Sequence, residues 1–221
     1  MFDFINRAAS IKDATVVAGL NELIPYGDWR SILGAASGLS SEERKAILVE
    51  AFADNLKHFG KYEYVAETTV LRPVKNRPLY CLFYATRHEK GIETFRDCQA
   101  QALKEQSKTR AATKVKYAQT KSGQAEIFKS LHDMGPDDLT VFRARQHRAA
   151  EQTLLELTPE SPGAIRYENL WPQVLVRHVV RRTDVNEIVA RLRREGKLLI
   201  SDWEKGRKVP QPHYRIQRPN A

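Results

Sequence analysis

The chain has 221 residues, of which 42% are hydrophobic and 29% charged, as in a globular protein with one large or two small domains. The longest apolar runs are too short to cross a membrane, so the composition argues against a membrane protein. The N-terminus lacks the basic start and long apolar stretch of a secretory signal, and we expect a cytoplasmic protein.

The first residues resemble part of a buried strand. Met1–Ile5 is apolar and aromatic around one carboxylate, and Asn6 and Arg7 follow it. A folded protein would rarely begin in this way. Apolar residues at helical spacing then predict three helices, over residues 14–23, 29–33 and 40–60.

The third of these helices has clear end signals. Ser40 and Glu43 have the spacing of a capping box, and Gly60 is placed as the C-terminal cap. Two segments rich in Tyr, Val, Thr and Leu follow and predict a hairpin with a long turn, with strands over residues 62–71 and 79–86.

The middle of the chain is helical and basic. A helix opens at Gly91 and runs to Leu103 or beyond it, and residues 104–121 carry six Lys or Arg and one Glu. That stretch is either a solvated basic linker or the exposed end of the helix. Two more helical patterns are separated by a Gly-Pro break and end before a Pro-rich turn, over residues 124–134 and 137–155.

Most of the net charge of +9 lies in the last quarter of the chain. From Arg166 to Ala221 there are 13 Lys and Arg against 6 Asp and Glu, whereas the other 165 residues carry 23 basic and 21 acidic side chains. This asymmetry indicates an anionic partner, or else a basic surface that only keeps the chain in solution.

The order of patterns after residue 163 is that of a winged helix, a variant of helix-turn-helix. A helix over residues 167–179 leads into a tight turn with Thr183 as the N-cap of a second helix, which ends at Gly196. A strand, a polar basic loop and a returning strand complete the series, over residues 197–203, 204–212 and 213–217.

The second helix of this series would enter a major groove. Its apolar stripe predicts which side chains face outward, and the loop adds cations suited to phosphates. The candidate nucleic-acid-binding residues are Arg182, Thr183, Asn186, Arg191, Arg194, Lys205, Arg207 and Lys208. Glu187 on the same face is unfavourable near phosphates, so a winged helix that binds a partner protein is the alternative.

The front half resembles a known family at two places. These are Phe2-Asp-Phe-Ile-Asn-Arg7, and Leu71-Arg-Pro73 with Pro78-Leu-Tyr-Cys-Leu-Phe-Tyr-Ala-Thr-Arg-His88 and Gly91. Both are similar to the three-Cys-motif partner proteins of bacteria. That family joins a Rossmann-like, methyltransferase-like domain to a C-terminal winged helix, so the resemblance implies an α/β part followed by an α+β part.

The resemblance also implies where a reaction would take place. Met1–Ile5 would be a middle strand of a parallel sheet, and Asp3, Asn6 and Arg7 would lie at its carboxyl end, where such sheets bind ligands. These three are the candidate catalytic residues, although Asp3 and Arg7 could equally pair with each other. The Gly-rich turn that holds S-adenosylmethionine in such folds is missing from this sequence.

We therefore expect three parts. Residues 1–103 would form a partial methyltransferase-like domain, residues 104–122 a basic linker or helix end, and residues 123–221 a helical segment with the winged helix, whose core is 164–218. The chain would bind nucleic acid, most simply DNA, and no cofactor by itself. The alternative is a methyltransferase subunit that uses S-adenosylmethionine once a missing N-terminal part or a partner chain completes it. The expected protein partners are a complementing chain, a three-Cys-motif partner or a second copy of this chain. No metal site is expected, because Cys81 and Cys98 and the scattered histidines lack ligand spacing.

Overall fold

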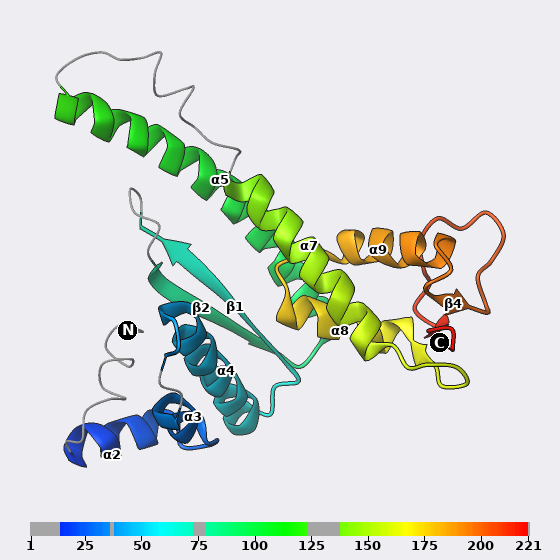
Figure 1. Ribbon diagram of the computed structural model, residues 1–221, viewed down its shortest axis with the longest axis horizontal. Helices are drawn as coiled ribbons and strands as arrows, with labels where there is room; N and C mark the ends of the chain where they lie inside the picture. Colours follow the sequence, from blue (N-terminus) through cyan, green and yellow to red (C-terminus); the bar gives the residue numbers. More distant parts are fainter. Residues whose placement is uncertain (1–13, 36–37, 73–77, 123–137, 221) are drawn as a thin grey trace. The chain divides into compact units, whose positions relative to one another are not determined.

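The computed structural model describes residues 14–35, 38–72, 78–122 and 138–220, which form two compact units (Figure 1). Unit 1 contains the described residues up to His88, and unit 2 contains those from Glu89 onward. The fold is mixed and mostly helical, with two small antiparallel sheets. The described residues contain no parallel sheet, and Met1–Ile5 and residues 124–134 lie outside them.

Unit 1 consists of three helices and a hairpin, as the sequence predicted. The elements are α2 (Ala14–Leu23), α3 (Trp29–Ala35), α4 (Ser41–Gly60), β1 (Tyr64–Leu71) and β2 (Pro78–Thr86). The capping box of α4 is confirmed, since Glu43 Oε2 accepts from Ser40 N at 2.8 Å and Ser40 Oγ accepts from Glu43 N at 3.2 Å. The Ser40 hydroxyl also donates to Glu43 Oε2 at 2.7 Å, and this hydrogen bond, together with the one from Ser40 N, lowers the pKa of Glu43.

The C-terminal end of α4 differs from the prediction. Gly60 is still helical, and Lys61 takes the left-handed position with φ 50°. Gly60 is required for space instead, because a Cβ there would lie 2.0 Å from the ring of Tyr62. Arg87 lies over that ring at 4.9 Å and donates through Nη2 to Gly60 O at 2.7 Å, so it satisfies one of the free carbonyls at the helix end.

The core of unit 1 lies between its helices and extends to one face of the hairpin. Ile24, Trp29, Leu33 and Leu48 are buried together. The strands pair antiparallel with Thr68 opposite Leu82, and Phe83, next to Leu82, packs on Phe52 of α4 at 4.7 Å. Because side chains alternate along a strand, Tyr80, Leu82 and Tyr84 are exposed on the other face.

Unit 2 has the order helix, helix, strand, helix, helix, strand, strand. The elements are α5 (Glu89–Ser122), α7 (Asp138–Leu157), β3 (Ile165–Arg166), α8 (Tyr167–Arg177), α9 (Arg182–Arg194), β4 (Leu199–Ile200) and β5 (Arg215–Gln217). Residues 104–121 are therefore the end of a helix and not a linker. The three short strands form one antiparallel sheet in the order β3-β5-β4, and β3 was not predicted from the sequence.

The core of unit 2 is formed by the inner faces of α7, α8 and α9 and by the sheet. The predicted stripe of α9 is confirmed, since Val185, Ile188, Val189 and Leu192 are all buried. The other fully buried large side chains include Leu154, Tyr167, Leu170, Val174, Leu175, Leu198, Tyr214 and Ile216. Arg96 of α5 is 2% exposed and donates to Leu175 O at 2.6 Å and Val176 O at 3.0 Å, so it fixes α5 to the end of α8.

The prediction of Thr183 as the N-cap of α9 is wrong. The helix begins at Arg182, and Thr183 is an exposed residue of its first turn. Asp184 takes over the capping role, because its Oδ2 accepts from Arg181 N at 2.8 Å. The C-terminal end of α9 is as predicted, since Gly196 has φ +73°. Gly196 N donates to Arg193 O, and Lys197 N donates to Leu192 O. This pair of hydrogen bonds is a Schellman cap.

Candidate nucleic-acid interface

The outer face of α9 carries five of the eight predicted binding residues, and they differ in how free their side chains are. Thr183 and Arg194 are exposed. Among the described residues, Arg194 donates only to Ala190 O of its own helix, from Nε at 3.3 Å. Both side chains are therefore available to a ligand that lies along the helix.

Two of the predicted residues are occupied within the protein. The Oδ1 atom of Asn186 accepts a hydrogen bond from the hydroxyl of Tyr167, a fully buried residue whose pKa is raised by its burial. The guanidinium of Arg182 lies 4.6 Å from the ring centre of Trp171 and 3.4 Å from Glu93 Oε2. Their main role is to hold α9 against α8 and α5.

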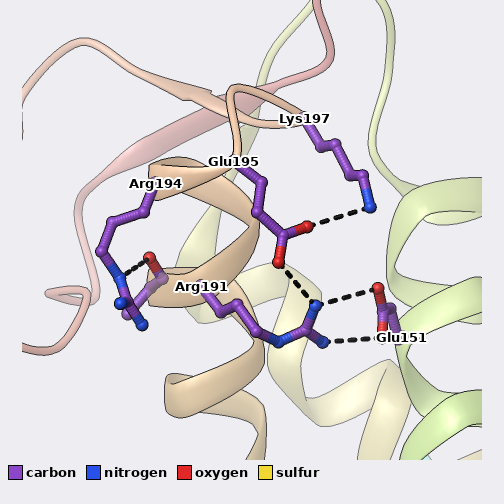
Figure 2. Close-up of polar contacts among 6 residues, drawn as sticks. Glu151, Arg191, Arg194, Glu195 and Lys197 are labelled. Carbon is purple, nitrogen blue, oxygen red and sulfur yellow. Dashed lines mark hydrogen bonds and ion pairs between the residues drawn. The ribbon is translucent and has the colours of Figure 1, made fainter.

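Arg191 is also engaged, at the centre of a network of charges (Figure 2). Its Nη2 and Nη1 donate to the two oxygens of Glu151 on α7 at 2.7 and 3.4 Å, and Nη1 also donates to Glu195 Oε1 at 3.1 Å. Lys197 Nζ completes the network 2.9 Å from Glu195 Oε2. These bonds raise the pKa of Arg191 and lower that of Glu195.

The loop between β4 and β5 carries the other three predicted residues and is anchored by aromatic contacts. Trp203 stacks under Arg193 at 4.5 Å, contacts Tyr214 at 5.6 Å and donates from Nε1 to Arg207 O at 3.1 Å. Arg207 pairs with Glu204 at 2.9 Å. Lys205 and Lys208 are exposed, and neither forms an ion pair with a described carboxylate.

A groove of about 910 Å³ runs between α7, α9 and this loop. Arg191, Arg194 and Lys208 line it, and so do Arg143 and Arg148 of α7. The two α7 arginines are exposed and were not among the candidates from sequence. Nothing local in sequence could show that this face lies beside α9.

Carboxylates also line the groove, but most of them are neutralised. Glu151 is held by Arg191, and Asp184 lies 3.2 Å from Arg181 Nη2 and 3.7 Å from His147. Glu187 alone among the carboxylates that line the groove has no described cation within ion-pair distance. The groove is therefore basic overall, with one unfavourable charge.

The candidate catalytic residues Asp3, Asn6 and Arg7 lie outside the described residues. Within the described ranges no three His, Cys, Asp or Glu side chains gather as metal ligands, and no helix there is apolar and long enough to cross a bilayer. Comparison with family models, curated proteins and solved structures finds no match to this chain. The function is accordingly argued from these side chains.

Proposed function

We propose that unit 2 is a winged-helix module that binds nucleic acid, and duplex DNA in particular, with α9 in the major groove and the loop between β4 and β5 at the backbone. The order of elements from α7 to β5 and the antiparallel sheet support this assignment. An α-helix of about 10–12 Å diameter matches a major groove about 12 Å wide.

The observation that carries the proposal is a run of exposed cations without carboxylate partners. Arg194 at the end of α9 and Lys205 and Lys208 on the loop fulfil this condition within the described part of the chain. Cations that are already paired inside a protein gain little from phosphates, whereas free ones release counterions when they bind. Arg194 is also the residue best placed for a bidentate contact to guanine.

The test is fluorescence anisotropy of a labelled DNA duplex with the full chain across a salt series. We expect binding at low salt. The logarithm of the association constant should fall linearly with the logarithm of the salt concentration, with a slope of about −0.9 per phosphate contact. An RNA duplex of the same sequence serves as the comparison. Undetectable binding to both at low salt would contradict the proposal.

A second proposal follows from unit 1. The resemblance to three-Cys-motif partner proteins suggests a subunit of a nucleic-acid methyltransferase that depends on S-adenosylmethionine. The favouring observation is the exposed face of the hairpin, where Tyr80 and Leu82 are 46% and 51% exposed. Apolar surface of this kind suits contact with another protein chain.

Mass measurement by light scattering, with calorimetric titration of S-adenosylmethionine, tests this second proposal. We expect the chain alone to associate and to bind the cofactor too weakly to measure. Leu82→Ser should lower the associated mass, and Leu199→Ser, an equally simple change at an exposed leucine of unit 2, should not. A monomer that binds the cofactor stoichiometrically would contradict this account.

A further inference from the structure

The groove between α7, α9 and the loop has cations on both sides. Arg143 and Arg148 are contributed by α7, Arg194 by α9 and Lys208 by the loop. All four side chains belong to exposed residues, and no described carboxylate forms an ion pair with any of them. An anion that entered this groove would meet four cations that the protein has not neutralised.

Paired charges shape the wall between these cations. Arg191 is joined to Glu151 at two points, which links α9 to α7 across the groove and removes the negative charge of Glu151. Arg191 is therefore a positioning residue in this arrangement. Its guanidinium keeps the two helices at a fixed separation and leaves contact with the anion to its neighbours.

The spacing along α7 fits a strand with repeating charges. Arg143 and Arg148 are five residues apart, which corresponds to about 7.5 Å of helix at a rise of 1.5 Å per residue. Phosphates follow each other every 3.4 Å along the axis of one DNA strand, so the two arginines can reach phosphates about two steps apart. The groove is also continuous with Arg194, the exposed arginine of α9.

We infer that this groove holds the sugar–phosphate backbone of a nucleic-acid strand, with Arg143, Arg148 and Lys208 as the phosphate-contacting residues. This inference rests on the proposed function and adds α7 to the interface. The candidate residues from sequence included none on α7, and this helix now supplies part of the binding surface. Backbone contacts of this type fix the position of a duplex and do not read its sequence.

The protein provides a matched control on α7. Arg145 is exposed between the two arginines but does not line the groove. Replacing any of these by Ala removes one positive charge from an exposed position. Only the place of the charge distinguishes the variants from their control.

The experiment measures the salt dependence of DNA binding by the full chain and its variants. For Arg143→Ala, Arg148→Ala and Lys208→Ala we expect the log–log salt slope to become shallower by about 0.9 each, the value of one phosphate contact. Arg145→Ala should leave the slope unchanged. A two- to tenfold loss of affinity at moderate salt should accompany the shallower slopes.

Three results would overturn the inference, and they are distinguishable. If the wild-type chain binds DNA but groove and control variants lose the same slope, the backbone runs elsewhere while the proposed function stands. If the wild type does not bind nucleic acid at low salt, both fall together. If the wild type binds an Asp- and Glu-rich peptide and no nucleic acid, the groove is an acidic-peptide site.

Discussion

Units 1 and 2 use their apolar and charged residues in opposite ways. Eleven large hydrophobic residues are exposed in the described ranges, and eight of them belong to unit 1, among them Phe59 at 61% and Leu82 at 51%. Unit 2 exposes only Val141, Leu199 and Val209 from this class. Its surface is instead occupied by arginines and lysines, some paired and some free.

Under the two proposals above, the units recognise different kinds of partner. Unit 2 completes its core with its own described residues, so its remaining surface can serve a charged ligand. Unit 1 leaves an apolar face on the hairpin, which is typical of a surface that contacts protein. Each prediction below tests one side of this contrast.

The largest expected effect is on the core of unit 2. Leu192 is fully buried, and Leu192→Ala should destabilise unit 2 by about 2–5 kcal/mol, because it leaves a cavity in a packed core. Hydrogen exchange resolved by residue can measure this loss separately in each unit. Leu82→Ala is the control, since Leu82 is half exposed. Equal losses of hydrogen-exchange protection from both variants would show that the core of unit 2 at Leu192 is no better packed than the surface of unit 1 at Leu82.

The second effect concerns the free and engaged arginines of unit 2. Arg194→Ala should cost about 1–3 kcal/mol of binding free energy if its guanidinium contacts a base. Arg218→Ala should cost less, because Arg218 already donates to Thr158 O at 2.8 Å and pairs with Glu160 at 3.2 Å. Anisotropy titrations against one duplex compare the two variants. Losses of similar size would mean that α9 does not present its outer face to DNA.

The third effect separates direct contact from positioning at Arg191. Arg191→Ala should weaken DNA binding, because it leaves the Glu151 carboxylate without its cation beside the groove. At 4 Å in water one such charge repels a phosphate by about 1 kcal/mol. Adding Glu151→Gln should then restore most of the lost affinity. If the double variant binds as weakly as Arg191→Ala alone, Arg191 touches the nucleic acid itself.

The sequence predicted best what depends on local periodicity. The stripe of α9, its Gly196 cap and the α4 capping box all depend on residues within one or two turns of each other. The hairpin of unit 1 was predicted for the same reason. The short strand β3 was not predicted. It has only two residues, and its extended conformation depends on pairing with β5, about fifty residues later.

The candidate site was predicted less well, because its contacts join distant segments. Arg191 pairs with Glu151 forty residues before it, and Asn186 accepts from Tyr167 nineteen residues before it. An outward position on a helical wheel gave no sign of either partner. At the start of α9 two local caps competed, and the carboxylate of Asp184 displaced the hydroxyl of Thr183.

The smallest expected effect is a loss of unit 2 stability in mild acid that originates at His178. Its Nε2 lies 2.8 Å from Thr153 Oγ1, and burial, together with the positive charges of Arg96 and Arg177, lowers the pKa of His178 below its ordinary value. The unfolded chain therefore binds this proton more readily than the folded one. The contribution of His178 to the stability of unit 2 is fully present above about pH 6.5 and decreases as the pH falls below that value.

Hydrogen exchange in unit 2 at pH 7.5 and 5.5 should show the loss of stability, and His178→Gln should make that loss smaller. His213→Gln is the control, because it removes an imidazole from an exposed position of the same unit. An identical pH dependence in all three proteins would place the acid sensitivity at another group.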